Sequence, residues 1–364
     1  MPNIAYYVSS HGFGHAARQQ AVIDLLSQQP DMKIYARTGA PAKFFASATD
    51  YHQQRYDIGM IQQDALTMDI HASLQWMDDF LKYEEEPLIE AEVTFCKSHQ
   101  IDLIVSDMPS LACEVASCLG IPSVVMTHFT WDWVYAHYMN DFPQYQHIVA
   151  HLSEQYHKAT LALQMQVPYP HAFDMFPNVH PIGLVYNPAK RTRDEIRQLF
   201  DVPDEMPMVL LSMGGHHWEV DNIDALLQMD KVIFLVMPDV WQQVKHRGAH
   251  FREVPMTFDG YHDVIAHADV LVGKAGGSTV AEIIGHQTLM IYTTQDESDW
   301  REIGLLRRTL DDHASSLFVP LEAFLAGDWV TELPTFIAQN HHWTDINRNG
   351  AHEAVQHLLS PVEH

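Results

Sequence analysis

The chain has 364 residues, a length that accommodates two well-packed domains. Apolar residues make up 47% and charged residues 19%, which excludes a disordered chain, and no apolar run approaches the roughly 18–20 residues that a membrane span needs. The formal net charge of −26 disfavours nucleic acid and anionic membranes as partners.

The cysteines and histidines indicate no metal site. Cys96, Cys113 and Cys118 form no CxxC pair, which argues against a disulfide framework or a zinc site and favours a cytoplasmic location. Among 25 histidines, the pairs His216-His217 and His341-His342 suggest a metal at first. Adjacent histidines point in different directions in a helix or strand, so we expect scattered surface histidines and no metal or other cofactor.

The first half of the chain alternates strands with helices. Residues 2–10 lack a basic region and a cleavage site, so they predict a first strand and no signal peptide. We expect strands at 4–8, 33–36, 101–107 and 122–127, and helices at 16–28 and 109–119. This order predicts a parallel sheet covered on both faces. Because ligands bind beyond the carboxyl ends of such strands, the loops at 11–15, 107–110 and 127–133 are expected at a binding edge.

A second α/β series follows a break in the pattern at residues 181–188. We expect strands at 208–212, 232–236, 270–273 and 289–292, a helix at 280–285, and helices within 335–359 that begin after Pro334. The predicted fold is α/β, with two Rossmann-like domains whose parallel sheets face a central cleft. The expected domains are 1–183, 184–335 and a helical segment, 336–364, that packs back on the first domain.

The segment VLVGKAGGSTVAEII, residues 270–284, carries the strongest local signal. A buried strand runs into Gly276 and Gly277, which let the backbone approach a ligand, and a helix starts at Ser278 and Thr279. A helix start offers unpaired N–H groups and a positive dipole end to a phosphate, and Glu282 lies one turn inside, in reach of ribose hydroxyls. A bulky side chain at Gly277 is expected to block the ligand and leave the fold intact. An ordinary capped helix remains the alternative.

Three further segments are candidates for ligand contacts. HGFGHAAR, residues 11–18, follows the first strand, and its His15 is placed to act as a general base on an acceptor hydroxyl or to cap the helix. MGGHHWE, residues 213–219, is either a second cover for the diphosphate or a structural turn. HFTWDWVYAHYM, residues 128–139, supplies aromatic rings for the core or for a wall against which a sugar stacks. GxSxG elbows and kinase phosphate loops are missing.

These motifs resemble a known family. YYVSSHGFGHAAR, IVSDMPSLACEVASCLGIPSV, THFTWDWVYAHYM and GKAGGSTVAEII look like the glycosyltransferase-like N-terminal half of plant L-arabinokinases and its stand-alone bacterial relatives, in order over about 300 residues. A wider similarity reaches the GT-B glycosyltransferases, including the peptidoglycan N-acetylglucosaminyltransferase and the UDP-glucuronosyltransferases. No sugar-kinase domain follows in this sequence, so arabinokinase activity is not expected.

The resemblance implies a nucleotide-sugar-dependent transferase that acts without a metal, on a donor that is expected to be UDP-linked and an acceptor that the sequence does not name. The second domain would bind the donor, and the first the acceptor. The residues implied for the donor diphosphate and ribose are Gly214, Gly215, Lys274, Gly276, Gly277, Ser278, Thr279 and Glu282. Gln295 and Asp296 are approximate counterparts of the donor-sugar ligands.

His15 is implied as the base of an inverting transfer, and the acceptor side or its loops would include His11, Gly12, Gly14, Asp107 and Trp131. Two rival functions stay open: a catalytically silent nucleotide-sugar sensor, and a nucleotide-sugar 2-epimerase of the same architecture. The epimerase requires further carboxylates facing the sugar, and no definite set of them is evident. The sensor would keep Glu282 and the glycines but tolerate loss of His15.

Overall fold

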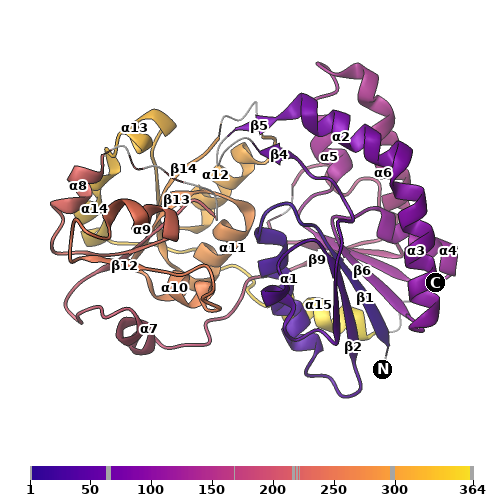
Figure 1. Cartoon of the computed structure of the whole chain (residues 1–364), viewed down its shortest axis with the longest axis horizontal. Helices are drawn as coiled ribbons and strands as arrows, with labels where there is room; N and C mark the ends of the chain where they lie inside the picture. Colours follow the sequence, from indigo (N-terminus) through magenta and orange to yellow (C-terminus); the bar gives the residue numbers. More distant parts are fainter. Residues whose placement is uncertain are drawn as a thin grey trace. The chain divides into compact units, whose positions relative to one another are not determined.

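The protein divides into two compact units, seen here in a computed structural model (Figure 1). The structure describes residues 2–62, 67–167, 169–214, 218, 220, 222–295 and 300–360. Unit 1 comprises Met1–Ile61, Met68–Tyr186 and Asn347–His364, and unit 2 comprises Gln62–Thr67 and Asn187–Ile346. None of the helices within the described parts of the chain has the length and apolarity that a bilayer crossing requires.

Unit 1 is built on a parallel sheet of seven described strands in the order β3-β2-β1-β6-β7-β8-β9. The strands are β1 (Asn3–Val8), β2 (Lys33–Thr38), β3 (Asp50–Gln53), β6 (Leu103–Asp107), β7 (Ser123–Thr127), β8 (Leu161–Met165) and β9 (Val179–Ile182). Two short strands, β4 (Ile61–Gln62) and β5 (Met68–Asp69), pair separately. The parallel sheet that the sequence predicts for this half is therefore confirmed.

Helices cover both faces of this sheet because side chains alternate along each strand. The helices are α1 (Gly14–Leu26), α2 (Ile70–Tyr83), α3 (Glu85–Ser98), α4 (Leu111–Leu119), α5 (Trp131–Ala136), α6 (Gln146–His157) and α15 (Gly350–Leu359), with short 3₁₀ turns η1 (Ala42–Phe45) and η2 (Pro143–Tyr145). Ile4, Tyr6 and Val8 join one core with α1 and α15. Tyr7 points the other way, and its hydroxyl donates to Glu92 of α3.

Unit 2 contains a second parallel sheet, with six described strands in the order β12-β11-β10-β13-β14-β15. Its strands are β10 (Met208–Ser212), β11 (Ile233–Val236), β12 (Phe251–Glu253), β13 (Val270–Lys274), β14 (Leu289–Thr293) and β15 (Ser316–Phe318). Its helices are α7 (Arg193–Leu199), α8 (Ile223–Leu227), α9 (Pro238–Val244), α10 (Tyr261–His267), α11 (Gly277–His286), α12 (Ile303–His313), α13 (Leu321–Leu325) and α14 (Trp329–Ala338).

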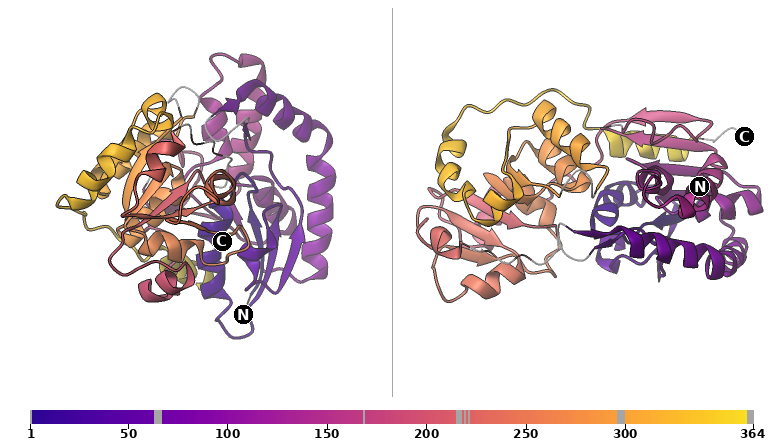
Figure 2. Two further views of the ribbon diagram at one scale, coloured as in Figure 1. Left: turned by 60° about the vertical axis from the view of Figure 1, so that its left-hand side comes forward. Right: turned by 90° about the horizontal axis from the view of Figure 1, so that it is seen from above.

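The C-terminal segment differs in detail from the sequence expectation. Pro334 does not precede a helix but lies inside α14, whose Trp329, Leu333 and Phe336 are buried in the core of unit 2. Burial of this apolar face outweighs the one N–H that proline withholds from the helix. The chain rejoins unit 1 at Asn347, not at residue 336, and α15 packs beside α1 (Figure 1). The right-hand view of Figure 2 shows this yellow helix against strands of unit 1.

Candidate functional site

Each sheet has one place where its strand order reverses, and the candidate residues gather there. In unit 1 the second strand in sequence, β2, lies on one side of β1, and β6 lies on the other. In unit 2 the same relation holds for β11, β10 and β13. Loops that leave the two central strands run to opposite faces of the sheet, so the carboxyl ends of these strands flank the crevice in which α/β proteins bind ligands.

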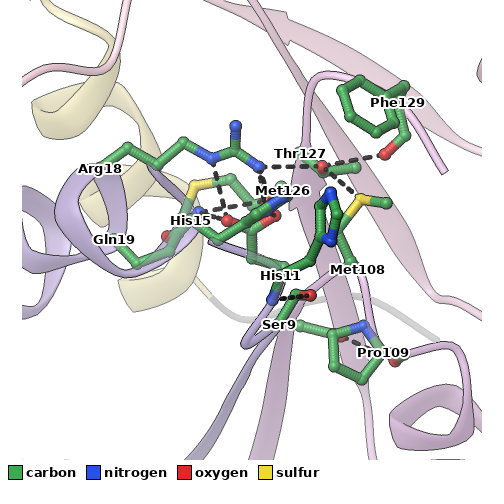
Figure 3. A network of polar contacts seen from close by, with 12 residues as sticks. Ser9, His11, His15, Arg18, Gln19, Met108, Pro109, Met126, Thr127 and Phe129 are labelled. Carbon is green, nitrogen blue, oxygen red and sulfur yellow. Dashed lines mark hydrogen bonds and ion pairs between the residues drawn. The ribbon is translucent and has the colours of Figure 1, made fainter. Parts of the chain in front are cut away.

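The edge of unit 1 is occupied by a buried ionic network that centres on Asp107, the last residue of β6. Figure 3 labels His15, Arg18 and Gln19 of this network. Arg18 of α1 donates two hydrogen bonds to this carboxylate, from Nε to Oδ2 at 2.9 Å and from Nη2 to Oδ1 at 2.6 Å. Gln19 donates from Nε2 to Oδ2 at 2.8 Å, and its Oε1 accepts a hydrogen bond from the hydroxyl of Tyr6. Burial alone would raise the pKa of Asp107, but the charges of Arg18 and His15 hold it well below its ordinary value.

His15 joins this network through one ring nitrogen. Its Nδ1 lies 3.1 Å from Oδ1 of Asp107 and 2.7 Å from Nη2 of Arg18. Its Nε2 makes no hydrogen bond within the described residues. An imidazole anchored at Nδ1 and unengaged at Nε2 has the geometry that proton exchange with a substrate requires.

The other residues expected at this edge have roles in the fold itself. Gly12 adopts a φ of +70°, and Gly14 opens α1. Nδ1 of His11 accepts from the backbone N–H of Met60 at 3.3 Å. Trp131 is only 1% exposed, and its indole N–H donates to Asp57 at 2.7 Å, so it lies in the core and not on an open wall.

Two buried groups that sequence reasoning missed lie just after β7. His128 is 4% exposed, and neither ring nitrogen has a partner in the described part of the chain. Burial and the charge of Arg18 lower its pKa to about 3, so it is neutral. Asp132 in the first turn of α5 has one unbonded carboxylate oxygen among the described atoms, and burial raises its pKa to about 6. Their signal in the sequence was only a polar residue inside an aromatic run.

The edge of unit 2 is formed by the start of α11, which has no side-chain cap. Gly276 is the N-cap residue and has no side chain to offer, and its carbonyl accepts from the N–H of Val280 at 2.9 Å. Within the described residues, the backbone N–H groups of Gly277, Ser278 and Thr279 therefore have no partner, and all three residues are half-buried. Such a helix end attracts an anion through its N–H groups and its dipole.

The glycines beside this helix start differ in the space around them. A Cβ on Gly276 would meet nothing within 4 Å, whereas a Cβ on Gly277 would lie 2.7 Å from Oε1 of Glu302. Glu302 is buried and bonded to Trp300, so it cannot move aside without cost. A bulky residue at Gly277 would therefore have to displace the carboxylate of Glu302, whereas Gly276 accepts one without such a shift.

Close backbone approach brings the two central strands of unit 2 together. Gly273 was not singled out in the sequence, yet a Cβ there would lie 1.7 Å from the carbonyl oxygen of Ser212 on β10. The loop after β10 contains Gly214, which has a φ of +69° and open space at its Cβ position. Gly215 lies outside the described residues. Lys274 ends β13 in register with Thr293 of β14.

Glu282 is buried inside α11 and already has partners within unit 2. Its Oε1 accepts from the backbone and side-chain nitrogens of Asn187, at 3.1 and 3.2 Å, and its Oε2 lies 3.1 Å from Nε2 of His286. The carboxylate thus fixes the beginning of unit 2 against α11. Because a carboxylate has about four acceptor sites, these contacts leave capacity for a ligand hydroxyl.

Polar groups at the end of β14 add to this edge. Gln295 is 4% exposed, and its amide nitrogen has no partner within the described residues, like the hydroxyl oxygen of Thr293. Asp296 lies outside the described residues. No cluster of histidine, cysteine and acidic residues with the geometry of a metal site occurs among the residues that the structure describes.

Two Rossmann-like units with these parallel sheets define a glycosyltransferase-like GT-B fold. The structure is similar to a UDP-glucosyltransferase from Polygonum tinctorium capable of glucosylating indoxyl, with a TM-score of 0.58, 14% identity and coverage of 99% of this chain and 95% of that chain. It is also similar to MurG of Acinetobacter baumannii, with a TM-score of 0.53, 14% identity and coverage of 98% and 99%.

In sequence the chain is similar to the L-arabinokinase of Arabidopsis thaliana, with 28% identity over 344 residues. The match covers 90% of this chain and 31% of that protein, so the chain spans about a third of the length of this relative. No family model matches the sequence. The resemblance and the fold that the sequence predicts are thereby confirmed.

Proposed function

We propose that this protein is a glycosyltransferase that moves a sugar from a nucleotide-diphosphate donor, of the UDP class, to a hydroxyl acceptor with inversion at the sugar carbon. The observation that carries the proposal is the uncapped start of α11 at the reversal point of the second sheet. Three N–H groups beside Gly276, which have no partner among the described residues, offer a diphosphate the charge complement that it requires, with no need for a metal ion.

The groups around this helix start suit the remaining parts of a nucleotide sugar. Glu282 lies on the second turn of α11, where its free acceptor capacity suits ribose hydroxyls. The amide nitrogen of Gln295, which no other described residue engages, suits a hydroxyl of the donor sugar. The positive end of the helix stabilises the diphosphate as it leaves, because negative charge grows on its oxygens in the transition state.

His15 is the proposed base. It would accept the acceptor proton at Nε2 as the acceptor oxygen attacks the sugar carbon, and Asp107 would stabilise the imidazolium through Nδ1. The likeness of the chain to about a third of the length of an L-arabinokinase supports a sugar-processing role. The L-arabinokinase name describes that whole protein, so the proposal does not extend to phosphoryl transfer.

A panel of UDP-, GDP- and dTDP-sugars tests the proposal by thermal shift, calorimetry and donor hydrolysis. The decisive variant is Gly276→Val, because its backbone is extended, at φ −127° and ψ 154°, and its Cβ position is open. The variant should keep its unliganded melting temperature and lose at least about 1.4 kcal/mol of donor binding, a tenfold change in Kd.

Gly276→Ala serves as the graded control and should show a smaller loss of affinity. Equal donor affinity in the wild type and in Gly276→Val would remove the diphosphate from α11. Binding of a donor with no turnover against any acceptor or water would favour the sensor over the transferase.

A further inference from the structure

The Nδ1 atom of His15 has two neighbours, of which one requires Nδ1 to donate a hydrogen bond and the other requires it to accept one. Asp107 can only accept a hydrogen bond from Nδ1, because an ionised carboxylate has no proton to donate. Arg18 can only donate, because a guanidinium has no acceptor. A neutral imidazole carries one ring proton, so Nδ1 satisfies one of these neighbours and not both.

The distances favour Arg18. Its Nη2 lies 2.7 Å from Nδ1, whereas Oδ1 of Asp107 lies 3.1 Å away, near the long end of the 2.7–3.2 Å range of N–H···O hydrogen bonds. Nη2 has two hydrogens, and its second one reaches Oδ1 of Asp107 at 2.6 Å. Asp107 does not require a hydrogen bond from the imidazole, because Nε of Arg18 and Nε2 of Gln19 both donate to its Oδ2.

We infer that Arg18 selects the tautomer of His15: by donating to Nδ1 it places the ring proton on Nε2, so the resting protein presents His15 as a hydrogen-bond donor and not as a base. The base form arises when Arg18 withdraws from Nδ1 and the ring proton moves to Nδ1, from which Asp107 accepts a hydrogen bond. Arg18 is thus a positioning residue that holds the site inactive. This second step rests on the proposed function, whereas the tautomer itself does not.

The proton balance of the two forms is simple. Conversion to the base form releases the Nε2 proton to solvent and takes one from solvent at Nδ1, so the net charge of the ring does not change. In the transfer step, the acceptor hydroxyl then gives its proton to Nε2 and its oxygen bonds to the sugar carbon, while the bond to the diphosphate breaks. The imidazolium that results donates through Nδ1 to Asp107.

The other titratable groups near His15 do not provide an alternative partner for Nδ1. Asp57 is bonded to Trp131, and burial raises its pKa. His128 is neutral for the reason given above. The ring of His11 has its centroid 6.5 Å from that of His15 and accepts from Met60. Arg18 and Asp107 therefore determine the state of Nδ1.

The test is the ring-nitrogen NMR spectrum of the full-length protein labelled with ¹⁵N-histidine, recorded at a pH where the imidazole is neutral. His15 is assigned by the signals that vanish in His15→Gln. The inference expects a protonated Nε2 and a bare Nδ1 in the wild type. A protonated Nδ1 in the wild type would overturn it, and this arm needs no variant beyond the one used for assignment.

Two variants then distinguish the effect of Arg18 on the His15 tautomer from the effect of Asp107. Arg18→Met should move the proton to Nδ1, because Asp107 becomes its only strong partner there, whereas Asp107→Asn should leave it on Nε2 because Arg18 remains. Arg37→Met is the matched control, since Arg37 grips Glu92 in the same two-bond manner and no described bond joins it to an imidazole. A proton that stays on Nε2 in folded Arg18→Met would refute selection by Arg18.

Activity supplies a second readout. Loss of Arg18 should raise the transfer rate on the alkaline plateau, since the base tautomer is no longer opposed. A purely structural role would lower the plateau. Absence of transfer in every variant, with Nε2 protonated in the wild type, would refute the proposed function and leave the tautomer inference standing.

Discussion

The two sheet edges share a strand order but hold opposite kinds of polar group. At the edge of unit 1, Asp107 is fully buried, and Arg18, Gln19 and His15 all contact it. At the edge of unit 2, the start of α11 is half-buried and leaves backbone donors without partners in the described residues. At the first edge, other side chains of the protein neutralise the buried charge. At the second edge, the described residues provide N–H donors but no acceptor for them.

This difference separates two tasks. A compensated ionic network fixes side chains in one geometry, which a proton-transferring group requires, at the cost of desolvating the charges. Uncompensated backbone donors need no side chain to be ordered and bind an anion wherever a glycine admits it. The comparison therefore predicts that substitutions at the edge of unit 1 affect turnover and stability, and that those at the edge of unit 2 affect ligand affinity.

The largest expected effect is on turnover. His15→Ala should lower the single-turnover transfer rate about 10²–10⁴-fold, the scale of one acid–base group, with donor affinity nearly unchanged. His11→Ala is the control, since it removes an imidazole from the same loop. The ring of His11 accepts a hydrogen bond from the backbone N–H of Met60. Melting temperature and rate are measured on the same preparation. Full transfer activity in folded His15→Ala would end the assignment of the base.

The next effect is on stability. Asp107→Asn leaves Arg18 buried without its anion and should lower the free energy of unfolding at neutral pH by about 3–5 kcal/mol. The pKa of Asp107 is lowered in the folded state, so its contribution is complete above its ordinary value of 3.8 and is lost as the pH falls through the folded value. Urea unfolding from pH 7 downward should show the two proteins converging in strong acid.

A matched change at the other edge sharpens this comparison. Ser278→Ala at the start of α11 removes a half-buried hydroxyl with no described bond and should change the free energy of unfolding by less than about 0.5 kcal/mol. A loss as large as that of Asp107→Asn would show that the helix start is a structural element and not an open binding end.

Asp132 gives an effect of opposite sign. Burial raises its pKa to about 6 from 3.8, so the folded state binds the extra proton and stability falls as the pH rises through this window. Above pH 6 the ionised carboxylate costs about 3 kcal/mol, at about 1.4 kcal/mol per pH unit. Asp132→Asn should therefore be more stable than the wild type at pH 7.5, by up to this amount, and should lose the advantage at pH 4. An advantage that does not depend on pH would contradict the assignment.

A smaller effect than the loss of turnover is expected on donor affinity. Glu282→Ala should weaken nucleotide-sugar binding by about 1.5–3 kcal/mol, the range of a hydrogen bond to a charged group. The variant also loses the bonds to Asn187, so Asn187→Ala is the matched control that removes the side-chain bond and keeps both the backbone bond and the carboxylate. Calorimetry on both separates the two roles. Equal losses of affinity would mean that Glu282 acts by fixing the backbone and not by holding ribose.

The sequence predicted the central strands and missed peripheral ones. β10 was predicted with its exact bounds, and β13 and β14 within one residue, because buried parallel strands are continuous apolar runs. β3, with the sequence DYHQ, and β9, which contains Pro181, were not assigned. Such edge strands are short and half-solvated, so their sequences carry little apolar signal.

The site was predicted as far as local backbone chemistry defines it. Glycines before an apolar helix indicate an anion-binding helix start from sequence alone, because the N–H groups and dipole belong to the helix itself. Arg18 and Gln19 lay within or beside a quoted motif but had no assigned role. Their partner, Asp107, is 88 or more residues away along the chain and meets them only after β1 and β6 pair.

The sequence by itself thus determined the two α/β series, the glycine-flanked helix start and the identity of the candidate base, since each depends on periodicity or on neighbouring residues. Only the tertiary structure decided which groups surround His15, which glycine has room for a side chain, and that Glu282 is bonded to Asn187. These outcomes depend on distances between atoms from separate elements, and packing fixes those distances to a few tenths of an ångström.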